Sequence, residues 1–394
     1  MSAAVDHCSF CEKSKDRVGK LIVSHKVAIC NECVDLCGGL LRDKKKSKSA
    51  KAVAVPDPRA IKDYLDQYVI GQETAKIALS VAVTNHCKRI NHPGNAIDKS
   101  NILMIGPTGT GKTLLARTLA RFLDVPFIIA DATTLTEAGY VGDDVDSMIT
   151  RLLTAADGDV DRCQRGIVFL DEIDKIARKS ESATVSRDVS GEGVQQALLK
   201  LVEGTRCRVA PSGNKKNSTD LVEIDTSDIL FIVSGAFVGM DRIVKNRVQG
   251  TAIGFGTTMS QPTTRPTVTP DDLVRYGMIP EFVGRFSTCV SLQDLDRAQL
   301  ISILGTVKNN LVEQYRWLFD QDSVDLKFDD DSLGLIVDRT LATKTGARGL
   351  HAELERILLP HMFDLPRYRR QQILGVTINK SLVNTPMTLL EQNT

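Results

Sequence analysis

Short apolar runs rich in Val, Ile and Phe recur through the middle of the chain, with helical patterns between them. The runs lie at residues 102–105, 127–130, 167–170 and 229–233. Parallel strands need a crossover connection, usually a helix, so strands that alternate with helices are typical of a parallel sheet covered on both faces. The pattern therefore predicts an α/β fold built around a parallel sheet.

Apolar residues at helical spacing predict the elements between and after these strands. Four of them recur at i, i+3, i+4 and i+7 after Gly193, namely Val194, Ala197, Leu198 and Leu201. We expect this apolar face to pack on the sheet. Another helix is expected over residues 73–83. Beyond about residue 295 strand-like runs become sparse and helical patterns dominate, which predicts a smaller, mostly helical domain.

Charge and length limit the class of protein. The chain has 394 residues, too many for one compact core, and its 50 Lys and Arg against 49 Asp and Glu leave a net charge of +1. This balance argues against a general nucleic-acid or membrane-surface binder. The N-terminus lacks a basic segment followed by an apolar one, and no apolar run approaches the ~18 residues of a membrane helix. We therefore expect a soluble, cytoplasmic protein.

Two Cys-x-x-Cys pairs lie close together near the N-terminus. Cys8 and Cys11 form the first pair and Cys30 and Cys33 the second, with 18 residues between them. This spacing is typical of two thiolate knuckles that hold one tetrahedral Zn²⁺. So short a segment buries too little apolar surface to fold alone, so metal binding would supply its folding free energy. Zinc is therefore predicted to be structural.

Spacing alone leaves the fourth zinc ligand open. Cys37 follows the second pair by four residues, and His7 and His25 flank the cluster, so each stays a candidate substitute. The remaining cysteines are scattered through the predicted sheet domain, which favours reduced thiols over a disulfide framework. The basic run 42–51 is interpreted as a flexible tether, with a local contact to nucleic acid as the alternative.

A glycine-rich loop follows the first predicted strand and matches G-x-x-x-x-G-K-[ST]. Its residues are Gly106, Pro107, Thr108, Gly109, Thr110, Gly111, Lys112 and Thr113, and Leu114 opens the following helix. In such loops backbone N–H groups surround phosphate oxygens at the positive end of the helix. Lys112 is expected to neutralise the β- and γ-phosphates, and Thr113 to place its hydroxyl on Mg²⁺. The chain is therefore predicted to bind ATP and Mg²⁺.

An acidic pair ends the third predicted strand. Asp171 would orient Mg²⁺, and Glu172, one residue further out, would polarise the water that attacks the γ-phosphoryl group. Two solvated acids at a strand end are the alternative, which the phosphate loop upstream disfavours. The pair predicts an ATPase rather than a protein that only binds nucleotide.

Four further motifs complete a resemblance to a known family. They are GYVG at 139–142, IGFG at 253–256, IPEFVGR at 279–285 and TGARGL at 345–350. Together with the zinc module and the phosphate loop, they resemble the ClpX family, the AAA+ protein-unfolding subunits of Clp proteases. The resemblance implies an AAA+ P-loop parallel sheet with a C-terminal helical small domain and an N-terminal four-cysteine zinc module. We expect the zinc module with its basic linker over 1–50, the large ATPase domain over 60–292 and the small domain over 295–394.

The resemblance also implies a homohexamer with ATP at the subunit interfaces. Tyr140 and Val141 match the loop that grips protein substrates in the axial pore, where the flanking glycines would let the aromatic ring swing. Arg285 matches the arginine that reaches the neighbouring subunit's γ-phosphate. Arg348 matches the arginine that links nucleotide state to the angle between the two domains within one subunit.

Two more roles come from the resemblance. Ile70, ahead of the phosphate loop, matches the segment that contacts adenine, although a buried turn before the helix at 73 is also compatible with it. Ile253, Gly254 and Phe255 match the loop that docks on a ClpP-type peptidase, and large apolar residues in a loop rich in Gly, Thr and Pro fit a docking role. Protein substrates, and adaptors that deliver them, are the partners implied.

Two positions depart from the family pattern or stay unassigned. Asn214, Lys215 and Lys216 stand where the family carries an Arg-Lys-His loop, which leaves the choice of substrate tag open. Ser234 follows the fourth predicted strand where many AAA+ proteins place a polar water-orienting residue, but the next two small residues leave its register undecided.

Two functions other than protein unfolding and one other unfoldase family stay open at this point. A DNA-remodelling or clamp-loading AAA+ protein shares the fold, although the balanced charge argues against it. A zinc-dependent adaptor whose nucleotide site only switches shape is disfavoured by the intact acidic pair. The related unfoldase HslU is a weaker match, because its family pattern lacks the zinc module.

Overall fold

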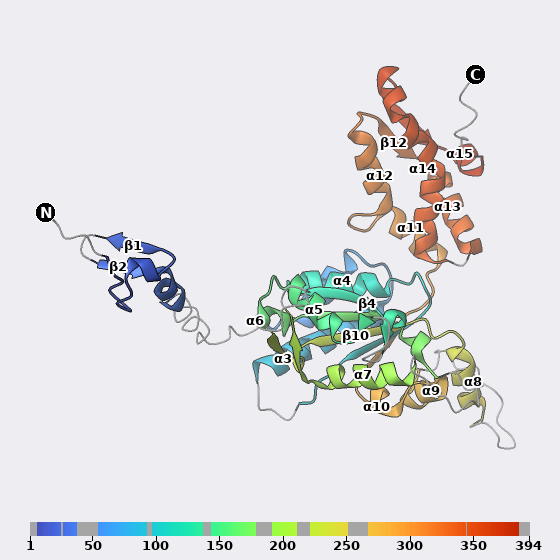
Figure 1. Ribbon diagram of the computed structural model, residues 1–394. Coiled ribbons are helices and arrows are strands. Elements are labelled where there is room, and N and C mark those ends of the chain that lie inside the picture. The colour runs from blue at the N-terminus through green and yellow to red at the C-terminus, as the bar shows by residue number, and fades with distance from the viewer. Residues whose placement is uncertain are drawn as a thin grey trace. The chain divides into compact units, whose positions relative to one another are not determined.

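The computed structural model describes residues 6–24, 27–37, 54–92, 97–136, 143–178, 191–210, 221–250, 267–343 and 345–385 (Figure 1). The chain divides into two compact units, residues 1–54 and 55–394. Among the described residues, none of the helices combines the length and apolarity that crossing a membrane requires.

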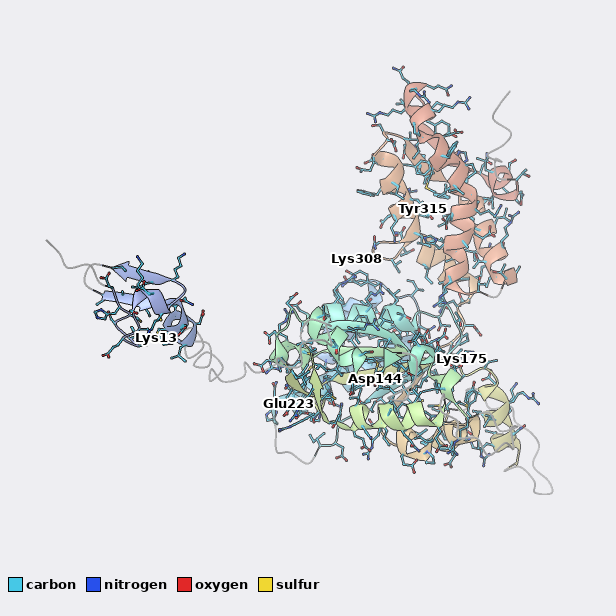
Figure 2. All side chains as sticks on the ribbon, in the orientation of Figure 1. Lys13, Asp144, Lys175, Glu223, Lys308 and Tyr315 are labelled. Carbon is cyan, nitrogen blue, oxygen red and sulfur yellow. The ribbon has the colours of Figure 1, made fainter. Side chains whose placement is uncertain are left out.

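The first unit is a small hairpin module. A 3₁₀ turn η1 (Lys15–Arg17) precedes the antiparallel strands β1 (Leu21–Ser24) and β2 (Val27–Cys30), which pair Leu21 with Cys30. Lys13, labelled in Figure 2, pairs with Glu32 at 2.6 Å across the module. Its buried apolar core consists of cysteines, with Val18, Leu21 and Ile29 packed around them.

The second unit contains a five-stranded, fully parallel sheet. The strand order is β11 (Thr288–Ser291), β3 (Ile102–Ile105), β10 (Leu230–Gly235), β7 (Ile167–Asp171) and β4 (Phe127–Asp131). All four predicted strands are confirmed, and β10 extends past its predicted end to include Ser234. The edge strand β11 was not predicted, because Thr288–Ser291 is short and only partly apolar.

Helices and two short strand pairs, one parallel and one antiparallel, accompany this sheet. The helices are α2 (Pro58–Asp66), α3 (Glu73–Asn91), α4 (Lys112–Leu123), α5 (Ser147–Ala155), α6 (Val160–Cys163), α7 (Glu192–Glu203), α8 (Met240–Gly250), α9 (Pro270–Tyr276) and α10 (Pro280–Val283). The 3₁₀ turns are η2 (Ala132–Thr134) and η3 (Ile173–Ile176), and the short strand pairs are β5 (Leu135–Thr136) with β6 (Asp143–Asp144) and β8 (Arg206–Val209) with β9 (Val222–Asp225).

The sheet is buried on both faces, as its apolar runs predict. Val168 and Phe231 belong to the core that contains the apolar residues of α5 and α7, whereas the alternate residues Phe169 and Ile232 are equally buried and point to the opposite face. The expected apolar face of α7 is confirmed, with Ala197 only partly buried.

A second core begins after residue 295 and is mostly helical. It is formed by α11 (Arg297–Gly305), α12 (Leu311–Asp320), α13 (Asp330–Thr343), α14 (Ala347–Arg370) and α15 (Lys380–Asn384), with the parallel strand pair β12 (Asp325–Phe328) and β13 (Gly375–Ile378). Helix α14 continues through Pro360 and Pro366, because its apolar face packs into this core on both sides of Pro360. The mostly helical second domain is confirmed.

Candidate nucleotide site and zinc centre

The phosphate loop connects β3 to α4 at the carboxyl edge of the sheet. Gly109 and Gly111 have φ values of +83° and +96°, which glycine adopts without a side-chain clash. Helix α4 begins at Lys112, so its N-terminal N–H groups face the loop. The Lys112 Nζ donates to Gly106 O at 2.7 Å and to Pro107 O at 2.9 Å. The ammonium group therefore lies over the loop, where phosphate oxygens would be received.

Charges around the loop act on Lys112. Burial lowers the pKa of Lys112, the carboxylates of Asp171 and Asp174 oppose that shift, and Arg348 adds to it. Lys112 thus feels two acids, Asp171 at the end of β7 and Asp174 in η3, and one cation from the small domain. A polyanion bound here would meet two positive side chains of this chain.

Asp171, the last residue of β7, joins the loop to the neighbouring strand. Its Oδ2 accepts a hydrogen bond from Thr113 Oγ1 at 3.4 Å, and its Oδ1 accepts one from Ser234 Oγ at 2.5 Å. A hydroxyl and a carboxylate are the hard oxygen ligands that Mg²⁺ prefers, so Thr113 and Asp171 fit a magnesium site next to the phosphates. The structure brings together these two residues, which the sequence separates by 58 positions.

Glu172 differs from Asp171 in backbone and exposure. Its φ of +58° lies in the left-handed region, which is uncommon for a residue with a side chain and is often found at functional sites. Its carboxylate is exposed and forms no hydrogen bond or ion pair with the described part of the chain. One residue beyond Asp171, this carboxylate is available to accept a proton from a water molecule.

Two polar residues near the site were not assigned from the sequence. The register of Ser234 was undecided, and Asp174 was not predicted at all. Ser234 is fully buried in β10 opposite Met104 of β3, which fixes its register. The Asp174 Oδ1 accepts from Ala236 N at 3.1 Å, and a Cβ added to Gly235 would lie 2.6 Å from it. Asp174 therefore holds the end of β10 that carries Ser234. The signal in the sequence was a third acid three residues after Asp171.

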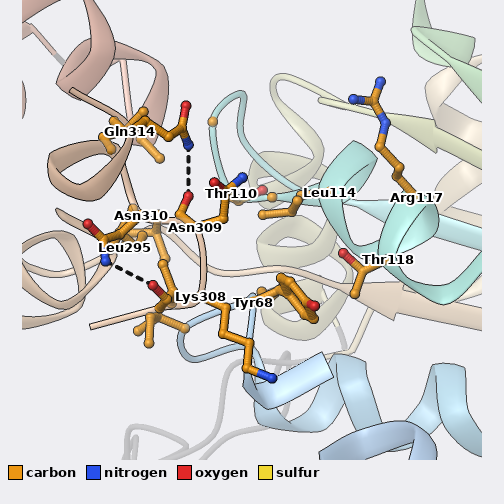
Figure 3. A pocket seen from close by; sticks show the side chains of 18 of the residues that line it. Tyr68, Thr110, Leu114, Arg117, Thr118, Leu295, Lys308, Asn309, Asn310 and Gln314 are labelled. Atoms are coloured by element: carbon orange, nitrogen blue, oxygen red, sulfur yellow. Dashed lines mark hydrogen bonds between the residues drawn. The ribbon is translucent and has the colours of Figure 1, made fainter. Parts of the chain in front are cut away.

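A cavity of about 330 Å³ opens beside the phosphate loop (Figure 3). Its lining comes from residues 68–121 and from residues after 294: Tyr68, Val69, Ile70, Gly109, Thr110, Gly111, Leu114, Arg117, Thr118, Arg121, Leu295, Ile303, Val307, Lys308, Asn309, Asn310, Leu311, Gln314 and Ala347. Ile70 lies in this lining, as expected for a residue that contacts a base. The Gln314 Nε2 donates to Asn309 O at 2.7 Å and fixes the turn on the small-domain side.

Direct contacts hold the two cores together around this cavity. Ala347 N donates to Gly109 O at 3.2 Å, and Lys308, labelled in Figure 2, donates from its backbone N to Gln67 O at 2.9 Å. The Gln72 side chain donates to Gln293 O at 2.8 Å and accepts from Gln293 N at 3.0 Å. The small domain therefore contacts the phosphate loop and the segment that contains Ile70.

The two arginines of the predicted site lie in different places. Arg348, in the first turn of α14, is exposed and close enough to act on the pKa of Lys112. Arg285 lies at the amino edge of the sheet, where its backbone O accepts from Asn101 Nδ2 at 3.2 Å and its guanidinium pairs with Glu203 at 2.5 Å. The four residues of β3, about 13 Å long, separate Asn101 from the phosphate loop. The structure does not bring Arg285 to the Lys112 of the same chain.

Several predicted residues lie outside the described part of the chain. They are the pore residues Tyr140 and Val141, the docking residues Ile253, Gly254 and Phe255, and the basic residues at 214–216.

The four predicted zinc ligands converge in the first unit. The Sγ atoms of Cys8, Cys11, Cys30 and Cys33 all lie within 4.8 Å of one another. Two of them, Cys11 and Cys30, are 3.6 Å apart, close to the ~3.8 Å edge of a tetrahedron with Zn–S bonds of about 2.3 Å. Among the described residues this group does not include Cys37 or His7, and His25 lies outside the described residues. The four-cysteine assignment is confirmed.

The electrostatics of the cluster fit a bound cation. Burial opposes ionisation of Cys8, but backbone N–H groups at Cys11, Phe10 and Cys30 lower its pKa to about 6. The neighbouring Cys11 sulfur and burial raise the pKa of Cys33 well above its usual range. Four thiolates this close repel one another, so a divalent cation is needed to hold all four deprotonated.

Fold and site together define a class of protein, the AAA+ ATPases. Residues 97–289 match the AAA domain family (Cdc48 subfamily), and residues 295–373 match the C-terminal, D2-small domain of ClpB protein. Residues 6–43 match the ClpX C4-type zinc finger. The ATP-dependent Clp protease ATP-binding subunit ClpX of Treponema denticola is 46% identical over 389 residues, which cover 95% of this chain and 93% of the relative. The chain belongs to the ClpX family and has the ATP-dependent unfoldase role of that family, with ATP, Mg²⁺ and Zn²⁺ as its cofactors.

Proposed function

We propose that this protein works as a homohexamer that threads client proteins through its axial pore into a ClpP-type peptidase in the cytoplasm. One observation carries the catalytic part of the proposal. Thr113, Ser234 and Asp171 form one hydrogen-bonded group beside the phosphate loop, with the exposed Glu172 next to it. This arrangement separates a metal-holding carboxylate from a carboxylate free to take a proton.

The proposed roles follow from these positions. Residues 106–114 receive the phosphates and Ile70 contacts the adenine. Lys112 neutralises the β- and γ-phosphates, while Thr113 and Asp171 would hold Mg²⁺, which would supply positive charge to the phosphates when bound. Glu172 orients and deprotonates the attacking water.

The position of Arg285 supports a site completed by two subunits. Arg285 and Lys112 lie at opposite edges of the sheet, so the Arg285 guanidinium, which pairs with Glu203 within the chain, would act on the phosphates of a neighbouring subunit and not on its own. In this role Arg285 stabilises the charge that develops during phosphoryl transfer. Arg348, from the small domain of the same subunit, links the nucleotide to the angle between the two domains.

The remaining roles rest on the family resemblance. Tyr140 and Val141 grip the client in the pore, and Ile253, Gly254 and Phe255 dock on the peptidase. The proposed boundaries are 1–50, 60–292 and 295–394, and the two separate cores of the second unit support the last division. None of the nine cysteines, all of which lie in the described residues, forms a disulfide, which fits the reducing cytoplasm.

Glu172→Gln tests the catalytic assignment. We expect ATP turnover to fall by roughly 10²–10⁴-fold, because a positioned general base contributes on that order. ATP binding should persist, because the substitution leaves the loop and Asp171 intact. Glu223→Gln, an exposed carboxylate in strand β9, is the control. Wild-type turnover in Glu172→Gln would refute the assignment.

A tagged, folded fluorescent reporter with a ClpP-type peptidase tests the mechanical role. We expect ATP-dependent loss of fluorescence that Tyr140→Ala abolishes. Unchanged loss in that variant would remove Tyr140 from the gripping role. Stimulation of ATP turnover by duplex DNA but not by unfolded protein would instead favour the DNA-remodelling alternative.

A further inference from the structure

Helix α7 and the segment 277–285 lie side by side between the two edges of the sheet. The N-terminal part of α7 contacts η3, just after the carboxyl end of β7, and α10 packs on α7 (Figure 1). At the amino edge, Asn101 Nδ2 donates both to Val202 O of α7 at 3.3 Å and to Arg285 O at 3.2 Å. Segment 277–285 therefore begins beside Arg178, just after the turn that follows the hydrolytic carboxylates, and ends at the arginine that the chain offers to its neighbour.

Gln195 of α7 connects the turn after Glu172 to segment 277–285 at the carboxyl edge of the sheet. Its side chain is fully buried, with 0% of its surface exposed. The Nε2 atom donates to Ile176 O at 2.8 Å, at the end of the turn that follows Glu172, and the Oε1 atom accepts from Ile279 N at 2.9 Å, at the start of α10. One amide thus joins two backbone segments that lie far apart in the sequence.

A backbone contact beside Gln195 holds the same two segments. Arg178 N donates to Gly277 O at 2.9 Å, and a Cβ added to Gly277 would lie 2.4 Å from Arg178 O. The turn after Glu172 has supports besides Gln195, since Asp174 binds the end of β10. Ile279 N–H, in contrast, has the Gln195 oxygen as its partner. Loss of the amide should therefore disturb α10 more than the turn.

We propose that Gln195 is a positioning residue for Arg285. Through its amide, the hydrolytic turn of one subunit holds the helix whose end presents the arginine to the next subunit. The inference rests on the proposed role of Arg285 across the interface. Gln195 itself contacts neither nucleotide nor client in this arrangement and acts through α10.

An assembly of two different subunits tests the proposal, because it places the hydrolytic site in one kind of subunit and Arg285 in the other. Donor subunits carry Glu172→Gln, so they cannot hydrolyse ATP but still supply Arg285. Acceptor subunits carry Arg285→Ala, so they keep the hydrolytic site but depend on a donor neighbour. If phosphate is released only when the two kinds of subunit are mixed, Arg285 of one subunit acts on the nucleotide of the next.

Gln195→Met is placed in either subunit of this mixture. Methionine nearly keeps the size of the side chain but removes both hydrogen bonds. In the donor we expect phosphate release to fall on the order of 10²-fold, the typical effect of a displacement of about 1 Å in a catalytic group. In the acceptor we expect release within about twofold of the parent mixture, a result that also shows that the variant folds and assembles.

Two controls make the result specific. Gln196→Met changes the adjacent, exposed glutamine of α7 and should leave both mixtures unchanged. Ile279→Pro removes the N–H from the other side of the bond at a φ of −73°, which proline accepts, and should reproduce the donor effect if Gln195→Met proves too unstable to purify.

The outcomes distinguish this inference from the function on which it rests. No release from the parent mixture would mean that Arg285 does not act across the interface. Release from the parent mixture that survives Gln195→Met in the donor would overturn the positioning role of Gln195. An equal loss from either placement would also overturn it, because the amide would then support the hydrolytic site alone.

Discussion

Ser234→Ala isolates one hydrogen bond to the proposed magnesium ligand. The hydroxyl of Ser234 donates to Asp171 Oδ1 at 2.5 Å from a fully buried position in β10. Alanine removes only the oxygen, so the strand keeps its packing. Asp171 then keeps two weaker supports, Glu172 N at 3.0 Å on the same oxygen and Thr113 Oγ1 at 3.4 Å on the other.

The size of the effect follows from the kind of bond that is lost. Hydrogen bonds to charged groups contribute about 1.5–3 kcal/mol. If Asp171 must hold its orientation in the transition state, the loss appears in kcat as a factor of roughly 10–150. ATP affinity should change less, because the loop and Lys112 are untouched. We therefore expect a lower kcat with a nearly constant KM.

Steady-state phosphate release measured against ATP concentration gives both constants. Ser80→Ala is the matched control, because Ser80 is also buried and its hydroxyl also forms one hydrogen bond, to Lys76 O at 2.7 Å within α3. Thermal unfolding of both variants separates catalysis from stability. A kcat within twofold of wild type in a folded Ser234→Ala protein would refute the orienting role of Ser234.

Three further predictions address the zinc centre, the domain contact and acid stability. Cys11→Ser should unfold residues 6–37, because metal binding supplies on the order of 10 kcal/mol of the folding free energy of this module. Circular dichroism of the isolated unit measures the unfolding, and basal ATP turnover of the whole chain should persist. A module that is folded without zinc would contradict this prediction. Gly109→Ala should weaken ATP binding measured by calorimetry, because the added Cβ would lie 2.6 Å from Thr345 O. Gly239→Ala is the control, since Gly239 also has a positive φ but a Cβ added there has nothing within 4 Å. Equal ATP affinities of the two variants would refute the argument. Burial and neighbouring cations lower the pKa of His86 to about 3. As the pH falls below about 6.5, the unfolded chain therefore protonates this imidazole while the folded chain does not. The free energy of unfolding then falls by at most about 1.4 kcal/mol per pH unit. His86→Gln should flatten this slope in scanning calorimetry, and an unchanged slope would show that other groups cause it.

Local patterns were sufficient to predict the elements that depend on local sequence. The buried strands of a parallel sheet read as continuous apolar runs, and the phosphate loop and zinc knuckles have fixed spacing, so their positions follow from the sequence. Strand β11 was not predicted because Thr288–Ser291 forms a strand by pairing with β3, and this pairing does not follow from the residues of β11 alone. The register of Ser234 was undecided for the same reason.

Gln195 and Gln196 show why the remaining site residues could not be predicted. The two are adjacent in a helix, have the same side chain and carry the same helix propensity, yet one is fully buried and the other exposed. Their periodicity places Gln195 beside the apolar face, where a polar residue would be expected to lower stability unless its amide found partners. Those partners, Ile176 O and Ile279 N, come from segments 19 residues before and 84 residues after it. A buried amide with such distant partners can fix the distance between two segments, and only the folded chain shows which segments those are.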